Sequence, residues 1–273
     1  VFHHILGGLF TYLLCRSFKI SVTGSIMGGL IQAFLPGIFR SAIFLGGILY
    51  VQPITWLPLI LFFFKKAMDT ENLRYALLTG IIIAVQILAG SPQFAFIFQM
   101  GFLFYVFFSA PLAILRSKGA QPLLSARTYP ILLKRVAYLV LAFIVGYALP
   151  ALQLLPTHEL ASLSTRAGGV SLETARMGSM DVGTFLGFFI MPSSSYTGVW
   201  VLPSSVHPGV SGLPVGVGNL VFALFVLTGI FTLWPKPSRD LLIFWALLTI
   251  CFVLSFGPRT PFYSIFHHLP GFR

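Results

Sequence analysis

Long apolar runs separated by short polar segments form the main pattern along the chain. A helical apolar run of about 20 residues can cross a hydrocarbon layer about 30 Å thick, and runs near that length recur throughout the sequence. They give eight candidate spans, at residues 1–15, 22–39, 46–64, 73–89, 94–115, 136–155, 220–234 and 241–256. The first is short, because about 15 helical residues extend only about 22 Å. The pattern predicts an all-α, polytopic helical membrane protein with about eight spans.

The composition supports the same fold class. Of the 273 residues, 57% are hydrophobic and 15% aromatic, whereas Asp, Glu, Lys and Arg together make up 8%, against about 25% in an ordinary soluble domain. The mean hydropathy is +0.93. Cys15 and Cys251 both lie in apolar runs, without the spacing of a metal site or a disulfide framework. These values exclude a soluble enzyme.

Positive charge is divided unequally between alternate loops. If residue 1 lies outside, one set of loops holds twelve of the 17 Lys and Arg residues: Arg16, Lys19, Lys65, Lys66, Arg74, Arg116, Lys118, Arg127, Lys134, Arg135, Lys236 and Arg239. The other set holds the remaining five: Arg40, Arg166, Arg176, Arg259 and Arg273. Cytoplasmic loops carry the excess of Lys and Arg, so the first set is expected in the cytoplasm. The net charge of +11 then reports orientation in the bilayer, and we expect no nucleic-acid partner.

This orientation divides the chain into three parts. Residues 1–155 would form a bundle of six spans, the first one truncated, and residues 220–273 two spans and the start of a further outer segment. Between them, residues 156–219 form one long extracytoplasmic loop. Its short apolar segment 182–190 follows the potential helix caps Ser179 and Asp181. About ten residues cannot cross a bilayer, so the segment predicts an interfacial helix.

The middles of the candidate spans lack Asp, Glu, Lys and Arg, which argues against an ion-coupled transporter. The polar side chains there are amides: Gln32, Gln52, Gln86, Gln99 and Gln153. We interpret them as partners in hydrogen bonds between helices, in preference to substrate contacts. The adjacent histidine pairs at 3–4 and 267–268 are interpreted as interface anchors, because neighbouring residues on a helix point about 100° apart.

The long loop begins with a cluster of charged and polar side chains. Its members are His158, Glu159, Arg166, Glu173, Arg176 and Asp181. Carboxylates here could act as a general base or orient a sugar hydroxyl, and arginines could hold a phosphate. The competing interpretation is a solvated loop with ordinary ion pairs.

Several short segments, in their order along the chain, are typical of one family. They are His3-x-x-x-Gly7-Gly8-Leu9 with Tyr12 and Arg16, Trp56-Leu57-Pro58, Gln-Ile-Leu-Ala-Gly-Ser-Pro-Gln at 86–93, Leu-Pro-Ala-Leu-Gln-Leu-Leu-Pro-Thr-His-Glu at 149–159, Ser-Thr-Arg-Ala-Gly at 164–168, and Gly-Pro-Arg-Thr-Pro and Leu-Pro-Gly-Phe-Arg within 257–273. Through these segments the chain resembles the YfhO family of bacterial membrane proteins, which belong to the GT-C type of polyprenyl-phosphate-sugar-dependent glycosyltransferases. It departs from the family at Ser91, where members tend to have His.

The resemblance implies a GT-C-like fold in the bacterial cytoplasmic membrane. It implies transfer of one sugar from an undecaprenyl-phosphate carrier to a cell-envelope acceptor, such as a teichoic-acid or lipoteichoic-acid polymer, on the outer face. The candidates for phosphate or sugar contact are His158, Glu159, Arg166, Arg176, Asp181 and Arg259. The catalytic base of such enzymes lies in an outer loop after the first helix, which would precede residue 1. We therefore expect an inactive piece of a longer enzyme.

Three points stay open at this level. No residue pattern for a metal site is present, while a divalent metal remains open as a cofactor because it would depend on residues outside these 273. A flippase or transporter of lipid-linked intermediates would need a hydrophilic path across the bilayer. A non-catalytic membrane scaffold would need neither that path nor an outer-face carboxylate beside a phosphate site.

Overall fold

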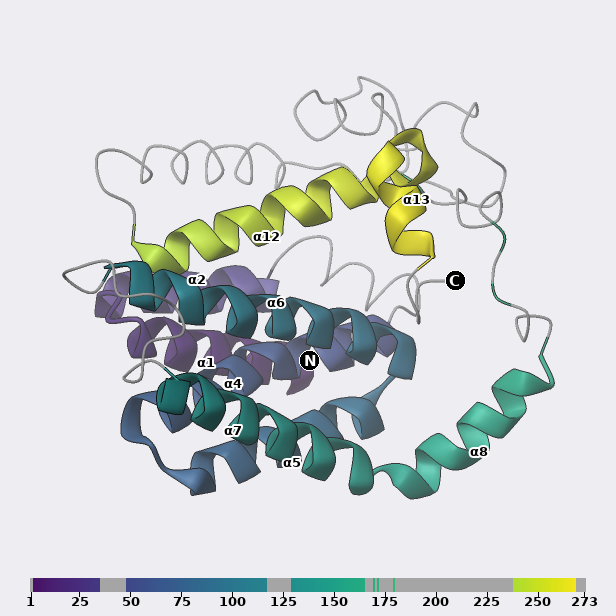
Figure 1. Ribbon diagram of the computed structural model, residues 1–273, viewed down its shortest axis with the longest axis horizontal. Coiled ribbons are helices and arrows are strands. Elements are labelled where there is room, and N and C mark those ends of the chain that lie inside the picture. Colours follow the sequence, from purple (N-terminus) through teal and green to yellow (C-terminus); the bar gives the residue numbers. More distant parts are fainter. Residues whose placement is uncertain are drawn as a thin grey trace. The chain divides into compact units, whose positions relative to one another are not determined.

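The protein is helical in every element that the computed structural model describes (Figure 1). The described residues are 2–34, 48–116, 129–164, 169, 171, 179 and 238–268. The chain forms two compact units, Val1–Glu159 and Leu160–Arg273. The all-α prediction is therefore confirmed for the described part of the chain. The candidate span 220–234, the predicted helix 182–190, and residues Arg166, Arg176 and Asp181 lie outside it.

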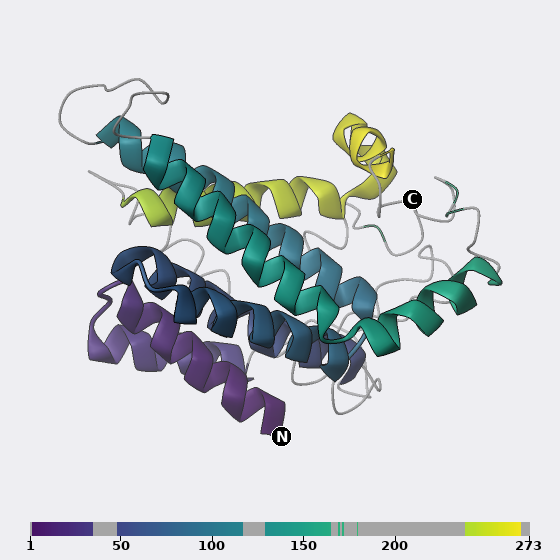
Figure 2. The same cartoon turned by 60° about the horizontal axis from the view of Figure 1, so that its bottom comes forward.

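The first unit is built from seven described helices, the last of which ends just inside the second unit. They are α1 (Phe2–Ser17), α2 (Val22–Phe34), α4 (Ile48–Thr70), α5 (Leu73–Ala89), α6 (Pro92–Arg116), α7 (Tyr129–Ala148) and α8 (Ala151–Ser162). Helix α1 packs on α2 and α4, α4 packs also on α5 and α6, and α5 packs on α7. Figure 2 shows α1 and α4 side by side, and α7 continuing into α8 through a bend.

Glycines bring two pairs of these helices into backbone contact. A Cβ atom on Gly8 of α1 would lie 2.8 Å from the carbonyl oxygen of Gly29 in α2. A Cβ atom on Gly80 of α5 would lie 2.7 Å from the carbonyl oxygen of Ala142 in α7. Both distances are shorter than a carbon atom tolerates, so no larger residue fits at this spacing. Small residues at close crossings are typical of helices that associate in membranes.

Local sequence explains where several helices begin and end. Asn72 caps α5, and its side chain accepts a hydrogen bond from the backbone N–H of Arg74 at 3.0 Å. Helix α6 begins at Pro92, a residue suited to the first helical turn because its missing N–H would have no helical partner there. Helix α4 continues beyond the candidate span 46–64 to Thr70. Lys65 and Asp69 stabilise this extension as an ion pair one turn apart.

The expectation of one continuous helix at 136–155 is wrong. Helix α7 ends at Ala148, and α8 starts at Ala151 with a bend of 73° between the two. Pro150 lies at this break, where a proline lacks the N–H that would continue the helical hydrogen bonding. Residues 156–162, expected as the start of the loop, are helical and form the second half of α8. Gln153, expected inside a span, lies on the exposed surface of α8.

The described part of the second unit contains α12 (Arg239–Ser255), the 3-10 turn η1 (Gly257–Arg259) and α13 (Pro261–His267). Ser238 caps α12 by accepting a hydrogen bond from the N–H of Leu241 at 3.2 Å. Gly257 has a φ of 57°, in the left-handed region that favours glycine, and it ends the α12 segment.

Among the described helices, α6 alone is both long and apolar enough to cross a membrane by itself, over Pro92–Ser109. Helices α7 and α8 would provide a second crossing if the bent pair formed one span. The apolar helices Val22–Phe34, Leu73–Ala89 and Asp240–Ser255 are shorter. A helix of 25 residues extends about 37 Å, enough for the hydrocarbon core of a bilayer.

Candidate functional site

The predicted site residues of the described region lie on two separate elements. His158 and Glu159 follow one another on α8, in the first unit, and both side chains are exposed. Arg259 lies in η1 of the second unit, where its Nη1 group donates a hydrogen bond to the carbonyl oxygen of Ser179 at 3.3 Å. Ser179 was expected only as a helix cap, so this contact was not foreseen.

A second group of polar and aromatic side chains gathers where the beginning of α1 meets α4. We call it the Trp56 cluster, and its members are His3, His4, Phe10, Gln32, Thr55 and Trp56. The Thr55 hydroxyl, which is buried, donates a hydrogen bond to the carbonyl oxygen of His3 at 3.2 Å. The Trp56 ring lies edge-on to the ring of His3, with 6.5 Å between ring centroids, and 5.5 Å from that of Phe10. Ring packing and the hydrogen bond from Thr55 to His3 therefore join α1 and α4 in this cluster.

Helix α2 completes the Trp56 cluster. The side chain of Gln32 lies against Gly7, since a Cβ atom there would meet its Cγ at 3.6 Å and the Oγ1 of Thr55 at 3.7 Å. His4 is buried against the backbone of Ala33. Three helices thus contribute side chains capable of hydrogen bonding to one region.

Two buried polar atoms on these helices have no hydrogen-bond partner within the described part of the chain. They are the Nε1 of Trp56, in α4, and the Oγ1 of Thr11, in α1. An unpaired buried N–H or hydroxyl costs about 1–3 kcal/mol, and a native structure rarely leaves one without a reason. A ligand that accepts a hydrogen bond from the Trp56 N–H would remove that cost.

A chain of hydrogen bonds between amides connects four helices next to this cluster. Gln86 of α5 donates from Nε2 to the carbonyl oxygen of Pro53 in α4 at 2.8 Å. Gln99 of α6 donates from Nε2 to Oε1 of Gln86 at 3.2 Å, and the hydroxyl of Tyr147 in α7 donates to Oε1 of Gln99 at 2.7 Å. Both glutamines are fully buried, at 0% exposure. The interpretation of these two amides as interhelical partners is confirmed.

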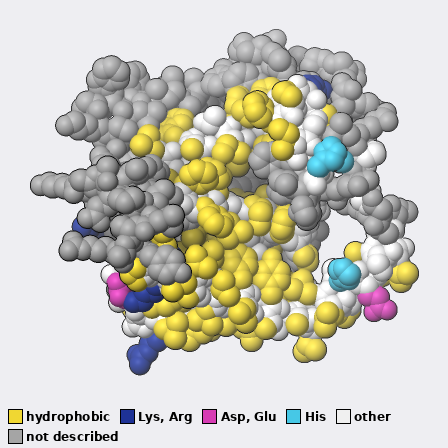
Figure 3. Space-filling view, viewed as in Figure 1, with side chains coloured by type: hydrophobic (Ala, Val, Ile, Leu, Met, Phe, Trp, Pro, Cys, Tyr) yellow, Lys and Arg dark blue, Asp and Glu magenta, His cyan; other side chains and the backbone are white. Residues whose placement is uncertain are grey.

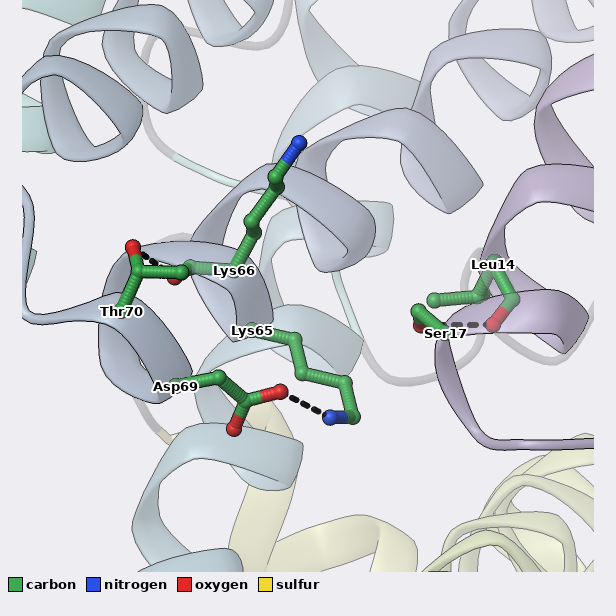
Figure 4. Close-up of polar contacts among 6 residues, drawn as sticks. All are labelled: Leu14, Ser17, Lys65, Lys66, Asp69 and Thr70. Atoms are coloured by element: carbon green, nitrogen blue, oxygen red, sulfur yellow. Dashed lines mark hydrogen bonds and ion pairs between the residues drawn. The ribbon is translucent and has the colours of Figure 1, made fainter.

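Most of the charged side chains that the structure describes in the first unit lie at the opposite ends of its helices, which we call the basic end. Lys65 pairs with Asp69 within α4 (Figure 4), and Lys134 of α7 pairs with Glu71. The Nζ of Lys66 lies 4.5 Å from the ring centroid of Tyr75 in α5. Figure 3 shows the Lys and Arg side chains of this unit at its left end, beside a broad hydrophobic face. Charge and uncharged polarity thus occupy opposite ends.

One ionisable group at the basic end has a shifted pKa. The Glu71 carboxylate accepts a hydrogen bond from the Lys134 ammonium group and raises the pKa of this lysine. Because its pKa is raised, Lys134 stays positively charged over the whole physiological pH range. It lies just before the apolar residues that begin at Val136.

The described residues contain no group of three or more His, Cys, Asp or Glu side chains that could hold a metal ion. From the sequence, His3 was interpreted as an interface anchor and Trp56 was named only for the family resemblance, and neither was assigned any chemistry. The signal that could have found the Trp56 cluster is the repeated occurrence of polar and aromatic residues within the first three apolar runs.

No protein-family model, no curated protein and no solved structure matches this chain.

Proposed function

We propose that this chain is the membrane-embedded part of a glycosyltransferase that moves a sugar from a polyprenyl-phosphate carrier to a cell-envelope acceptor. In this proposal the chain crosses the bacterial cytoplasmic membrane several times, in a GT-C-like fold. The basic end faces the cytoplasm. The Trp56 cluster and α8 lie at the outer face, where the sugar is transferred.

The observation that carries the proposal is that contacts join two of the resembling segments directly and reach residues next to them in the other helices of the first unit. His3 contacts Trp56, and Trp56 lies three residues after Pro53 in α4. The Pro53 carbonyl accepts from Gln86, the first residue of the third segment. Through Gln99 the contacts reach Tyr147, at the end of α7, immediately before the segment that includes α8. These contacts link residues of distant segments across α1, α4, α5, α6 and α7.

The unequal distribution of charge supports the orientation. Arg16, Lys65, Lys66 and Lys134 lie at the basic end, and cytoplasmic ends of membrane helices are rich in such residues. The opposite end offers uncharged amides, hydroxyls and aromatic rings. These groups suit a sugar, which presents hydroxyls to hydrogen-bond and C–H faces to stack on a ring.

The chemistry is a displacement at the anomeric carbon. An acceptor hydroxyl attacks this carbon and loses its proton to a carboxylate, while the bond to the carrier phosphate breaks and the polyprenyl phosphate leaves. The phosphate stays at the interface, because its charge is excluded from the hydrocarbon and its tail is not. In the proposal Arg166, Arg176 and Arg259 stabilise its charge, and Glu159 orients a hydroxyl.

A transfer assay with matched variants tests the proposal. Membranes containing the protein at its natural full length receive undecaprenyl phosphate carrying a radiolabelled sugar, and label entering polymer is measured. Glu159→Gln preserves the size of the side chain and removes its charge. Leu152→Ala, on the same helix at a side chain 90% exposed, is the control. We expect transfer by the wild type and the control, and at least about a tenfold loss in Glu159→Gln.

Absence of transfer with every sugar donor offered would contradict the proposal and favour a flippase or a scaffold. Equal transfer by Glu159→Gln and wild type would remove Glu159 from the site.

A further inference from the structure

A cavity of about 210 Å³ lies at the basic end, between the end of α4 and the start of α7. Its charged and polar lining consists of Glu71, Lys134, Arg135 and Tyr138. The apolar lining consists of Ala67, Met68 and Pro130. The cavity thus presents two cations and one carboxylate around a space large enough for a phosphate with a short substituent.

The lining groups are held in place by contacts of different strength. The Tyr138 hydroxyl donates to the carbonyl oxygen of Glu71 at 2.9 Å, which fixes the turn between α4 and α5 against α7. Arg135 donates from Nη1 to the Oγ of Ser109 in α6 at 3.3 Å. The Glu71–Lys134 pair is more accessible, with side chains 69% and 41% exposed. Because an exposed ion pair contributes only about 0.2–1 kcal/mol, a ligand can separate its members at little cost.

We propose that this cavity binds the headgroup of an aminophospholipid of the phosphatidylethanolamine class, its phosphate between Lys134 and Arg135 and its ammonium group on Glu71.

The mixture of charges favours such a zwitterion over a simple anion. A simple anion that binds Lys134 would break the ion pair of this lysine with Glu71. The Glu71 carboxylate would then lie unpaired, close to the negative charge of the bound anion. A phosphate linked to an ammonium group gives Lys134 and Glu71 a new partner each. One weak ion pair is then replaced by two, and Arg135 adds a third charged contact.

The surroundings favour a lipid over a soluble molecule with the same headgroup. Leu133 and Val136, which flank the cavity-lining residues on α7, have exposed apolar side chains, as do Leu73 and Leu77 on α5. Acyl chains attached to a headgroup in the cavity would cover such side chains. This inference rests on the proposed location in a membrane, where the basic end lies at the cytoplasmic headgroup layer.

Competition between lipids tests the inference. Purified protein in detergent is mixed with equal amounts of phosphatidylethanolamine, phosphatidylcholine and phosphatidylglycerol with identical acyl chains, and the lipids retained are quantified by native mass spectrometry. We expect phosphatidylethanolamine to be retained about two- to fivefold more than phosphatidylcholine, whose trimethylated nitrogen cannot donate to Glu71. That range corresponds to about 0.4–1 kcal/mol, which lies within the contribution expected of an exposed ion pair.

Three variants test which charged side chains bind the phosphate and the ammonium group of the lipid. Glu71→Gln should abolish the preference over phosphatidylcholine, and Lys134→Gln should lower retention of all three lipids. Lys65→Gln, whose partner Asp69 is not among the lining residues, should leave retention unchanged. Size-exclusion profiles and melting temperatures show that each variant is folded. The single substitutions leave Arg135 on Ser109, so the test does not depend on breaking that contact.

Two results would overturn the inference. Equal retention of the three lipids by the folded wild type would exclude headgroup recognition. Displacement of the lipid by soluble glycerophosphoethanolamine at matched concentration would exclude a lipid as the ligand. Both results leave sugar transfer untouched, so a failure here is distinguishable from a failure of the proposed function.

Discussion

Gln99 and Gln86 form a direct hydrogen bond between two fully buried side chains, with 3.2 Å between Nε2 of Gln99 and Oε1 of Gln86. Each amide has a further partner, so the bond is the central link of a chain that joins α4, α5, α6 and α7. The link fixes the depth at which these helices meet. It also ties the carbonyl of Pro53, close to the Trp56 cluster, to the end of α7.

Breaking this link should destabilise the first unit. In Gln99→Leu the oxygen of Gln86 and the hydroxyl of Tyr147 both lose a partner in an apolar interior. We expect the free energy of unfolding to fall by about 1–3 kcal/mol. Because Gln86→Leu removes the same link from the other side, the double variant should lose less than the sum of the two. Unfolding in mixed micelles, followed by circular dichroism, measures all three, and strict additivity would contradict a coupled chain.

The close helix contacts predict that alanine is destabilising at some glycine positions and tolerated at others. Gly146→Ala places a Cβ atom 2.5 Å from Cγ2 of Ile83, and Gly80→Ala places one 2.7 Å from the carbonyl oxygen of Ala142. Either substitution should force α5 and α7 apart and cost about 1–3 kcal/mol. Gly7→Ala is the matched control, because its Cβ atom meets nothing closer than 3.6 Å. The same unfolding measurement checks the contrast, and an equal effect at all three positions would show that crossing distance does not matter.

The positions of helices could be predicted from the sequence where capping residues coincide with the ends of an apolar run. The candidate span 73–89 coincides with α5, because Asn72 caps its start and Gly90 follows its end. The candidate span 136–155 is divided into α7 and α8 by a bend of 73° at Pro150, which apolar content alone cannot show. Helix α4 outruns its apolar segment because Lys65 and Asp69 pair across one turn.

The functional sites were harder to predict than the helices, because the residues that contact one another in a site lie on helices far apart in the sequence. The amides Gln86 and Gln99 were recognised as interhelical, but composition could not show that they bond to each other. Trp56 has an ordinary place in an apolar run, and only the fold reveals that its N–H is buried without a partner in the described region. The cavity at Glu71 and Lys134 depends on two residues 63 positions apart.

Because the N–H of Trp56 has no partner in the described part of the chain, we expect its removal to weaken substrate binding without lowering the stability of the protein. Trp56→Phe keeps an aromatic ring against His3 and Phe10 and removes the N–H. Because that group has no described partner to lose, the melting temperature should stay within a few degrees of the wild type. The KM for the lipid-linked sugar should rise about fivefold or more, the loss of about one hydrogen bond. Unchanged transfer kinetics in a folded Trp56→Phe variant would exclude the Trp56 N–H from substrate binding.

The proposed orientation predicts which residues can be labelled from outside. Glu159→Cys and Asp69→Cys each place one accessible thiol, on α8 and at the basic end respectively, in a background where Cys15 and Cys251 are replaced by Ser. A membrane-impermeant maleimide should modify Glu159→Cys on intact cells. It should reach Asp69→Cys only after the membrane is opened. The reverse pattern would invert the topology, and labelling of both on intact cells would contradict a membrane-spanning arrangement.

The most direct test of the account uses purified protein of natural full length in liposomes, with a panel of polyprenyl-phosphate-linked sugars and a water-soluble acceptor fragment. We predict that at least one labelled sugar moves to the acceptor, that polyprenyl phosphate is released in equal amount, and that Glu159→Gln slows both. If donor and acceptor remain unchanged with every sugar, while the protein is folded and correctly oriented, the glycosyltransferase assignment is contradicted.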